Sequence, residues 1–324
     1  MTTGMILGKF MPPHLGHVYL CEFASGYVDE LTIVVCSLER EPIAGHLRYE
    51  WMRELLPQAN VVHLTEELPQ EPGEHPDFWA LWKAALERVL PGVPDFVFAS
   101  EDYGAKLAEV LGGRFVPVDR ARSAVPVSGS AIRADPMANW GFIPRCVRPH
   151  FVKRVCVFGP ESTGKSTLAA DLAAHFRTCW VPEYARTFIE SQRGAISRDD
   201  MLAIASGQIA SEDALARNAQ RVLICDTDVL TTCLWSETLF GACDPRLRNK
   251  ATRPYDLTFL LDVDVPWVPD VVRFLPDDRV PFFARCRDAL DAHGRDYVVL
   301  SGTWDERFDR ACQAVASLIS CVVE

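Results

Sequence analysis

Residues 159–166 read Gly159-Pro160-Glu161-Ser162-Thr163-Gly164-Lys165-Ser166 and fit the phosphate-binding loop pattern G-x-x-x-x-G-K-[ST] at each fixed position. The preceding run, 154–158, is β-branched and aromatic, as expected of a strand, and the following run, 167–176, is rich in helix formers. A strand, a glycine-rich loop and a helix in this order present backbone N–H groups and the positive end of a helix to a polyphosphate. The stretch therefore predicts a P-loop domain.

Different residues of this loop are expected to contact different parts of Mg²⁺-ATP. Lys165 should reach the β and γ phosphates, and the hydroxyl of Ser166 should ligate Mg²⁺. The other residues expected to bind the nucleotide belong to the same run: Gly159, Glu161, Ser162, Thr163, Gly164 and Thr167. The sequence thus predicts ATP as a co-substrate, with Mg²⁺.

The bulk composition suits a globular α/β protein of two domains. The chain has 324 residues, of which 48% are hydrophobic and 24% charged. Its formal net charge of −11 argues against a nucleic-acid-coating surface, because neutralising phosphates needs clustered Lys and Arg. We therefore expect small-molecule ligands and no nucleic acid. The oligomeric state stays open, a homo-oligomer included.

The 11 cysteines indicate a reducing compartment. They form no CxxC pair and no Cys/His cluster at zinc spacing, and several lie inside apolar runs, such as Cys36 and Cys225. Buried reduced thiols account for this pattern. The N-terminus has no signal-peptide pattern, and no apolar run reaches membrane-spanning length. We expect a cytoplasmic protein with no membrane partner.

Strand-like and helix-like segments alternate along the chain, which predicts parallel sheets with helices on both faces. A Pro- and Arg-rich stretch at 144–150 interrupts the alternation just before the strand that leads into the phosphate loop. We place the domain boundary there, giving domains at 1–147 and 148–324. The expected strands are 4–10, 30–37, 60–65, 95–100, 114–118, 154–158, 179–181, 221–225 and 256–261, and the clearest expected helices are 78–89, 165–176 and about 199–220.

Directly after the first expected strand, an H-x-G-H core places His14 and His17 near a helix start. Gly16 allows close approach of a ligand to the backbone, because it has no Cβ. Two imidazoles beside a positive helix end suit the triphosphate of ATP and the charge that develops on it during transfer. Taken alone, such a pair of histidines is better explained by zinc binding or core packing. The loop also contributes Gly8, Lys9 and Phe10 as candidate nucleotide contacts.

A second stretch, residues 127–133, supplies hydroxyls, a glycine and an arginine at a loop that enters a helix. The candidates here are Ser128, Ser130 and Arg133. Together with H-x-G-H, this stretch resembles the nucleotidyltransferase family, whose members carry I-S-x-[ST]-x-x-R after the last strand; Val127 replaces the usual isoleucine. The resemblance implies a Rossmann-like domain that transfers a nucleotidyl group without a covalent enzyme intermediate.

Further stretches resemble the nicotinamide mononucleotide adenylyltransferase branch of that family. These are residues 99–104, 118–122 and 48–51. Tryptophan faces suit a cationic pyridinium ring. The candidates are Trp51, Trp79 and Trp82, with core packing as the alternative for each, most of all for Trp82.

In the second half, residues 222–226 form an apolar run that ends in Asp226, as in a strand that holds Mg²⁺. Asp228 is a further candidate for holding Mg²⁺ if the strand continues to it. Glu183 stands at the end of the preceding expected strand, where small-molecule P-loop kinases bind the phosphoryl acceptor. We expect Glu183 to orient or deprotonate a ribose hydroxyl, or else to serve as a helix-start carboxylate. Tyr184 and Arg186 follow it as ligand contacts.

Two more features complete the expected kinase site. Trp235 follows the Asp226 strand and is a candidate to stack on a nicotinamide ring. Residues 270–287 are rich in arginine and are expected to form a lid over ATP or a solvated polar segment. The arginines are Arg273, Arg279, Arg285 and Arg287, of which Arg273 and Arg279 are the candidate ligands.

The whole arrangement resembles the NadR family, which joins a nicotinamide mononucleotide adenylyltransferase to a ribosylnicotinamide kinase in this order. The most specific parts are H-x-G-H and residues 128–136 and 159–167. The resemblance implies a kinase that phosphorylates nicotinamide riboside and an adenylyltransferase that converts the mononucleotide to NAD. Some members carry an N-terminal helix-turn-helix; because Met1 lies a few residues before the first strand, we expect that module and DNA repression to be missing.

Two rival interpretations remain. A phosphopantetheine adenylyltransferase joined to dephospho-coenzyme A kinase would show the same motif order, and residues 100–104 and 183–186 favour the nicotinamide interpretation over it. A regulator that senses NAD or ATP without turnover is the other rival. The intact Lys165, Ser166 and Asp226, with both histidines, speak against it.

Overall fold

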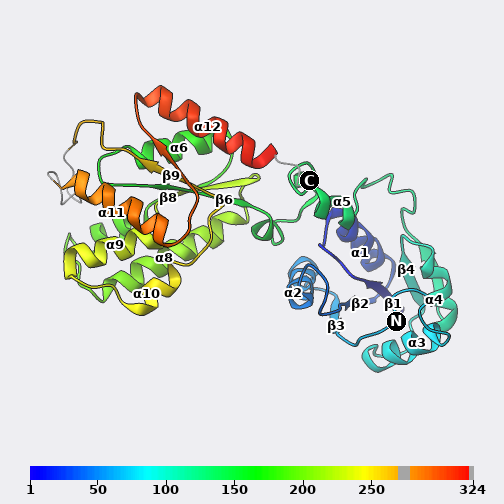
Figure 1. The fold of residues 1–324 in the computed structure, drawn as a ribbon. Coiled ribbons are helices and arrows are strands. Elements are labelled where there is room, and N and C mark those ends of the chain that lie inside the picture. The colour runs from blue at the N-terminus through cyan, green and yellow to red at the C-terminus, as the bar shows by residue number, and fades with distance from the viewer. Residues whose placement is uncertain (269–277, 321–324) are drawn as a thin grey trace. The chain divides into compact units, whose positions relative to one another are not determined.

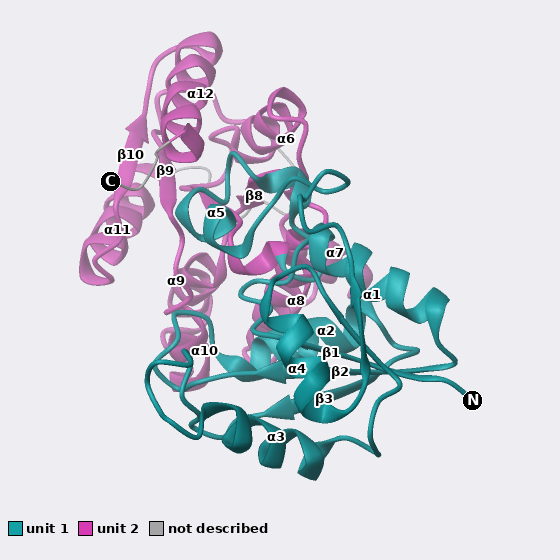
Figure 2. Ribbon diagram, turned by 90° about the vertical axis from the view of Figure 1, so that its right-hand side faces the viewer, with its two compact units in different colours: residues 1–147, 323–324 teal, residues 148–322 magenta. Residues whose placement is uncertain are grey.

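The computed structural model describes residues 1–268 and 278–320, which divide into two compact units (Figure 2). Unit 1 covers Met1–Val147, and unit 2 begins at Arg148. Each unit contains one five-stranded sheet in which all the strand pairs are parallel. The expected α/β fold with parallel sheets is confirmed.

The sheet of unit 1 has the strand order β3-β2-β1-β4-β5 (Figure 1). Its strands are β1 (Thr3–Gly8), β2 (Glu30–Cys36), β3 (Asn60–Leu64), β4 (Phe96–Ala99) and β5 (Arg114–Pro117). The helices are α1 (Leu15–Tyr27), α2 (Gly45–Leu55), α3 (Phe78–Val89), α4 (Tyr103–Leu111), α5 (Gly129–Ala134) and the 3₁₀ turn η1 (Trp140–Phe142). Because β1 has β2 on one side and β4 on the other, its carboxyl end lies at the point where the order reverses, which is where open α/β sheets bind ligands.

Successive residues of β1 point to opposite faces of this sheet, which creates two cores. Met5 packs with residues of α3 and α4 on one face, whereas Ile6 packs with residues of α1 and α2 on the other. Both side chains are almost completely buried. The continuous apolar runs of these strands follow from burial on both faces.

The sheet of unit 2 has the order β10-β9-β6-β8-β7. Its strands are β6 (Lys153–Phe158), β7 (Trp180–Val181), β8 (Val222–Asp226), β9 (Leu257–Leu261) and β10 (Tyr297–Leu300). The helices are η2 (Arg148–His150), α6 (Lys165–His175), α7 (Tyr184–Ser191), α8 (Asp200–Ala216), α9 (Val229–Phe240), α10 (Pro245–Lys250), α11 (Arg279–Ala292) and α12 (Trp304–Ser320). The central strand β6 leads into the phosphate loop.

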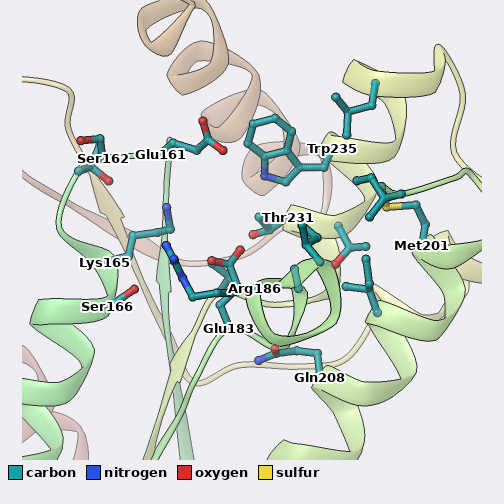
Figure 3. A pocket seen from close by; sticks show the side chains of 18 of the residues that line it. Glu161, Ser162, Lys165, Ser166, Glu183, Arg186, Met201, Gln208, Thr231 and Trp235 are labelled. Atoms are coloured by element: carbon teal, nitrogen blue, oxygen red, sulfur yellow. The ribbon is translucent and has the colours of Figure 1, made fainter. Parts of the chain in front are cut away.

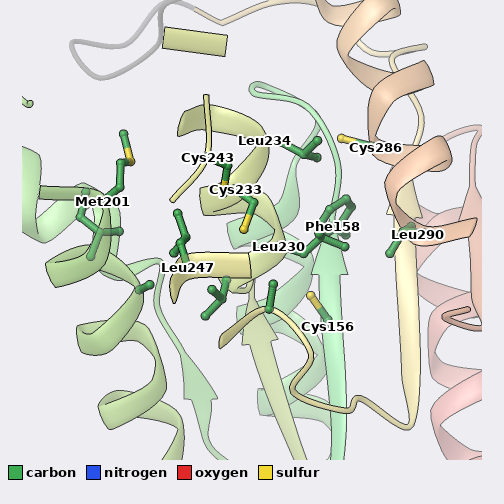
Figure 4. Packing of buried hydrophobic residues seen from close by; sticks show 14 of the residues in the cluster. Cys156, Phe158, Met201, Leu230, Cys233, Leu234, Cys243, Leu247, Cys286 and Leu290 are labelled. Carbon is green, nitrogen blue, oxygen red and sulfur yellow. The ribbon is translucent and has the colours of Figure 1, made fainter. Parts of the chain in front are cut away.

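The core of unit 2 also follows the alternation along β6. Cys156 and Phe158 face α8, α9 and α11, where buried cysteines and leucines fill the space (Figure 4). Val155 and Val157 face α6 and α12. Each fully buried aliphatic or aromatic side chain of this kind stabilises the fold by about 1.5–3 kcal/mol, so β6 holds the phosphate loop on a rigid base.

Several element boundaries differ from the sequence-based expectation. The first strand ends at Gly8 rather than Phe10, and the helix expected at about 199–220 ends at Ala216. Residues 279–292 form α11, with Phe282, Cys286 and Leu290 buried, so this part of the expected lid is a packed helix. None of the helices within residues 1–268 and 278–320 has both the length and the apolar character needed to cross a membrane.

Candidate active sites of the two units

The phosphate loop of unit 2 has the backbone conformation that its glycines allow. Gly159 and Gly164 have φ of +135° and +89°, and Ser162 between them has φ of +56°. A Cβ on Gly159 would lie 2.9 Å from the carbonyl oxygen of Leu261, so only glycine fits there. Within the loop, Lys165 Nζ donates a 2.7 Å hydrogen bond to the carbonyl oxygen of Pro160, which Thr163 Oγ1 also contacts, at 2.8 Å.

A pocket opens beside this loop and is bounded by α7, α8 and α9 (Figure 3). It brings together residues that are far apart in the chain: the loop, Glu183, Arg186 and Trp235. Of the residues named from sequence, its lining includes Glu161, Ser162, Thr163, Gly164, Lys165, Ser166, Thr167, Glu183, Arg186 and Trp235. The opposite end is apolar, so the pocket offers charged groups at the phosphate loop and an apolar surface for a flat ring.

Asp226 ends β8 next to the loop and is 1% exposed. Burial, and then the carboxylate of Glu183, raise the pKa of Asp226 from 3.8 to about 6, while Lys165 and a hydrogen bond with Ser166 act in the opposite direction. Its Oδ1 is buried without a hydrogen-bond partner among the described residues. A buried carboxylate oxygen with no partner, beside a serine hydroxyl, fits a divalent cation.

The donor set suits Mg²⁺ in particular. Mg²⁺ is commonly held by one or two protein oxygens together with substrate phosphates and water, rather than by an all-protein cage. Within the part of the chain that the structure describes, no group of three or more His, Cys, Asp or Glu residues could hold a metal by itself. Ser166 and Asp226 are therefore suited to hold Mg²⁺ in the presence of a nucleotide.

Asp228 does not join this site, contrary to the sequence-based expectation. The strand stops at Asp226, and Thr227 turns the chain with φ of +65°. Asp228 then caps α9 by accepting a 3.0 Å hydrogen bond from the backbone of Thr231, and its other oxygen pairs with Arg295. Its role is to fix the start of the helix that carries Trp235.

Glu183 and Tyr184 behave differently although they are adjacent. Glu183 is the residue before α7 and makes no side-chain cap hydrogen bond, so its carboxylate stays available to the pocket that it lines. The Tyr184 ring lies against Gly207, where a Cβ would be only 2.1 Å away, and Tyr184 is absent from the pocket lining. Tyr184 therefore packs α7 on α8, and its expected ligand contact stays a prediction.

Gln208 is a pocket residue that the sequence did not reveal. It is 3% exposed, and its Oε1 accepts a 3.0 Å hydrogen bond from the backbone of Tyr184. Its Nε2 is buried without a partner among the described residues, and the side chain lines the pocket (Figure 3). A glutamine in the middle of a helix carries no local signal of such a role, because the contact depends on how α7 packs on α8.

The arginines expected in the lid make different contacts. Arg279 Nη1 donates to the carbonyl oxygens of Val265 and Ser162, at 2.9 and 3.4 Å, so it lies beside the phosphate loop. Arg285 bonds Thr238 Oγ1 at 2.6 Å and pairs with Glu237 on α9. Arg287 forms an ion pair with its neighbour Asp288, at 4.0 Å. Arg273 lies outside the described residues.

Unit 1 contains a cavity of about 620 Å³ at the carboxyl end of β1. It gathers two loops that are more than a hundred residues apart in the chain. The candidates named from sequence in these two loops all line it: Gly8, Lys9, Phe10, His14, Gly16, His17, Ser128, Ser130 and Arg133. Gly129 brings the second loop against the first, since a Cβ there would lie 2.7 Å from the carbonyl oxygen of Met11.

His14 and His17 form a stacked pair at the start of α1. Their ring centroids are 3.7 Å apart with an interplanar angle of 23°, and His14 Nδ1 accepts a 3.3 Å hydrogen bond from the backbone N–H of His17. This contact leaves the proton of neutral His14 on Nε2, as a donor. Burial, assisted by the charge of Arg122, lowers the pKa of His14 from 6.5 to about 4. Burial, His14 and Arg122 lower the pKa of His17 well below its usual value.

The second loop provides a short helix with a defined start. Ser128 caps α5 by accepting a 3.1 Å hydrogen bond from Ala131. Arg133 on α5 donates to the carbonyl oxygen of Met11 and, at 3.3 Å, to Ser130 Oγ. The guanidinium therefore links the loop of the histidines to α5 at the edge of the cavity.

A buried ion-pair network shapes the first loop. Arg48 is 0% exposed and donates a 2.7 Å hydrogen bond from Nη1 to the carbonyl oxygen of Lys9. Glu41 pairs with both Arg48 and Lys9, the latter at 3.1 Å. The stretch 48–51 did mark Arg48, but its contact with Lys9 depends on the packing of α2 beside the sheet.

The three tryptophans of unit 1 that were named as candidates for stacking on a pyridinium ring take different positions. Trp79 and Trp82 line the cavity, whereas Trp51 on α2 does not. Trp82 is 7% exposed and its Nε1 donates a 2.8 Å hydrogen bond to the carbonyl oxygen of Pro69. Trp82 is therefore part of the core of unit 1 as well as of the cavity wall.

The chain is similar to known proteins over both units. A family model described as AAA domain matches residues 154–307, which include the phosphate loop. The chain is similar to the "Trifunctional NAD biosynthesis/regulator protein NadR" of Escherichia coli (strain K12), with 31% identity over 98% of this chain and 83% of that protein. The protein of the same name from Salmonella typhimurium (strain LT2) is likewise 31% identical, over the same shares.

Solved structures show the same fold over the whole chain. A NadR protein in complex with NR has a TM-score of 0.81 at 24% identity, and the match covers 100% of this chain and 97% of that one. A NadR protein in complex with NAD and AMP-PNP has a TM-score of 0.79 at 23% identity, with the same coverage. At this level of identity the likeness establishes the fold.

Proposed function

Because the chain belongs to the NadR family, we propose that it is a bifunctional enzyme of NAD salvage, with a kinase in unit 2 and an adenylyltransferase in unit 1. The kinase would phosphorylate nicotinamide riboside to nicotinamide mononucleotide, and the adenylyltransferase would convert the mononucleotide to NAD. Both reactions use ATP, and the similarity of the chain to a NadR protein in complex with NAD and AMP-PNP supports these ligands.

One observation carries the kinase proposal: the phosphate loop and an acceptor pocket meet at Asp226 and Glu183. The 5′-hydroxyl of nicotinamide riboside would attack the γ-phosphorus of ATP, the bond to the β-phosphate oxygen would break, and ADP would leave. Glu183 would orient the hydroxyl and accept its proton. Lys165 would neutralise the β and γ phosphates. Mg²⁺, held by Ser166 and Asp226, would supply further neutralisation of charge.

The pocket also accounts for the choice of acceptor. Trp235 stands in its wall with its ring supported by Phe282, at 4.8 Å between ring centroids. An electron-poor pyridinium ring is attracted to such an aromatic face. In nicotinamide riboside this ring is carried by a sugar, whose 5′-hydroxyl would face the phosphate loop. We assign Trp235 to the nicotinamide ring and Arg186, beside Glu183, to the polar part of the ligands.

In unit 1 the phosphate of the mononucleotide would attack the α-phosphorus of ATP and displace pyrophosphate. His14, with its proton on Nε2, and His17 and Arg133 would stabilise the charge that develops on the triphosphate. The low pKa values of the two histidines mean that they act at neutral pH as hydrogen-bond donors rather than as fixed charges. No covalent nucleophile is needed, because positioning and electrostatics suffice.

We further place both reactions in the cytoplasm. The ten cysteines within the described residues are all free thiols, and seven of them are buried. A reducing compartment maintains cysteines in that state.

A product assay tests the function. The purified chain is incubated with Mg²⁺-ATP and nicotinamide riboside, and the nucleotides are separated by chromatography over time. We expect the mononucleotide first and NAD afterwards. Mononucleotide alone would contradict the role given to unit 1. If no nicotinamide nucleotide forms, whereas phosphopantetheine or dephospho-coenzyme A is converted, the coenzyme A rival is correct; binding of NAD or ATP without any turnover would favour a sensor.

A further inference from the structure

Trp304 is a large aromatic residue that lies on the phosphate loop and yet stays half exposed. It is the first residue of α12, and 54% of it is exposed. A Cβ on Gly164 would lie 2.3 Å from Cζ3 of Trp304 and 2.7 Å from Cη2, so the six-membered ring rests directly on this glycine. The ring therefore borders the site where the triphosphate binds.

The position of the Trp304 ring is fixed by contacts at the start of α12. Thr303 and Glu306 form a reciprocal capping box: the backbone N–H of Thr303 bonds Glu306 Oε2 at 2.8 Å, and that of Glu306 bonds Thr303 Oγ1 at 3.3 Å. The guanidinium of Arg307 lies 5.4 Å from the centre of the Trp304 ring and is buried. A ring that is fixed in this way loses little conformational entropy when a ligand stacks on it.

The acceptor pocket lies on the other side of the loop. Its lining comes from the phosphate loop and from segments that follow β7 and β8, and Trp304 is not part of it. In the sheet order β10-β9-β6-β8-β7, the loop follows the central β6, the pocket lies toward β8 and β7, and Trp304 follows β10. The acceptor and Trp304 thus flank the phosphate loop on opposite sides.

The chemistry of phosphoryl transfer then gives a direction to the nucleotide. The attacking and leaving oxygens lie roughly in line on opposite sides of the transferred phosphorus. With the acceptor hydroxyl on the β8 side, the leaving ADP extends away from that side, toward β9 and β10. The base of the nucleotide is thereby directed to the flank where the exposed ring of Trp304 lies.

We propose that Trp304 is the platform on which the adenine ring of ATP stacks in unit 2. The proposal rests on the proposed kinase function of this unit and adds its nucleotide-base subsite. Stacking of a base on an aromatic side chain contributes enough that alanine substitution weakens binding by roughly 10- to 100-fold. Stacking does not read the base edge, so the platform accepts other purines as well.

The test measures the KM for ATP in the kinase reaction, in a His17→Ala background that silences unit 1. Trp304→Ala is expected to raise the KM for ATP by about 10- to 100-fold with kcat nearly unchanged, and Trp304→Phe is expected to keep most of the affinity. The inhibition constant of inorganic tripolyphosphate, which has no base, should stay the same in Trp304→Ala. A parallel loss of tripolyphosphate inhibition would instead show damage to the loop and overturn the proposal.

Trp267 provides the matched comparison. It also lies near the phosphate loop, stacked with Arg279 at 5.7 Å, while Arg279 contacts the carbonyl oxygen of Ser162. If Trp267→Ala raises the KM for ATP and Trp304→Ala does not, the base lies on the other ring and the proposal is wrong. If the kinase function itself fails, calorimetry with AMP-PNP in the same His17→Ala background still decides: Trp304→Ala must weaken AMP-PNP but not tripolyphosphate.

Discussion

Arg307, on the C-terminal helix α12, donates a 3.1 Å hydrogen bond from Nη1 to the carbonyl oxygen of Thr163, 144 residues earlier in the phosphate loop. The same guanidinium donates from Nε to Gly302 at 3.1 Å and pairs with Asp264. Arg307 is 1% exposed. One buried side chain therefore joins the loops that follow β6, β9 and β10.

Replacing Arg307 by Met should weaken the kinase and destabilise unit 2. The change leaves the carbonyl oxygen of Thr163, a fully buried residue, without this donor, and a buried unsatisfied group costs about 1–3 kcal/mol. We expect a lower melting temperature of unit 2 and a reduced kinase kcat/KM, with adenylyl transfer retained. Arg310→Met, on the exposed face of the same helix, is the control and should change neither. An unchanged melting temperature in Arg307→Met would contradict the bracing role.

The two activities should be lost separately. Lys165→Ala removes the charge expected on the β and γ phosphates and should lower the kinase rate by at least about 100-fold, without affecting adenylyl transfer. His17→Ala should have the opposite effect. Lys250→Ala and His46→Ala are matched surface controls. Rates are measured for each half-reaction with its own substrate, nicotinamide riboside or the mononucleotide. Loss of both activities in either variant would contradict independent sites.

Asp226→Asn should abolish the kinase and yet stabilise the nucleotide-free protein. The pKa of Asp226 is raised to about 6, so the folded state prefers the protonated carboxyl, and the stability that the proton confers is present below pH 3.8 and lost as pH rises through 6. At pH 7.5 the ionised, buried carboxylate therefore costs stability, up to about 3 kcal/mol. Asparagine removes this cost.

Calorimetric unfolding of wild type and Asp226→Asn, without nucleotide, checks this at two pH values. The variant should melt at a higher temperature at pH 7.5, and the difference should shrink at pH 5, where the wild-type carboxyl is protonated. Asp171→Asn, an exposed position on α6, should show no such dependence. A variant that melts at or below the wild-type temperature at pH 7.5 would contradict the prediction.

The buried histidine pair should make unit 1 sensitive to acid. Because the pKa of His14 is lowered to about 4 and that of His17 is lowered as well, the unfolded chain binds protons below pH 6.5 that the folded unit does not. The stability from this pair is present above pH 6.5 and is lost as pH falls toward 4, by about 3 kcal/mol for His14. Between pH 7 and 5, the melting temperature of wild-type unit 1 should fall more steeply than that of His14→Asn. His46→Asn should keep the wild-type slope, and parallel curves for wild type and His14→Asn would refute the prediction.

Local motifs explain how much was predictable from the sequence. The phosphate loop and H-x-G-H are each contained within a few residues, and their functional groups are placed by the turn from one strand into one helix. Asp226 was predictable for the same reason, because an apolar run that ends in an acidic residue marks a strand end at the ligand-binding edge. Family membership, expected from these motifs and the stretches between them, is confirmed by relatives that match nearly the whole chain.

Two residues take positions that local sequence patterns do not indicate. Asp228 was expected to extend the strand of Asp226, but the left-handed conformation of Thr227 turns it into a helix cap. Tyr184 lies beside Glu183 in sequence and yet packs on Gly207. The turn at Thr227 and the packing of α7 on α8 decide these positions, and the residue types alone specify neither.

Short-range patterns of strand, turn and helix are sufficient to indicate the fold class, the family and the groups that follow β1, β6 and β8. Three contacts are seen only in the folded chain: the hydrogen bond from Arg48 to the carbonyl oxygen of Lys9, the hydrogen bond from the backbone of Tyr184 to Gln208, and the packing of the Trp304 ring against Gly164. Such contacts join segments that are distant in the chain, so they depend on how helices pack on the sheet. That packing results from the shape of the whole core, which no local pattern encodes.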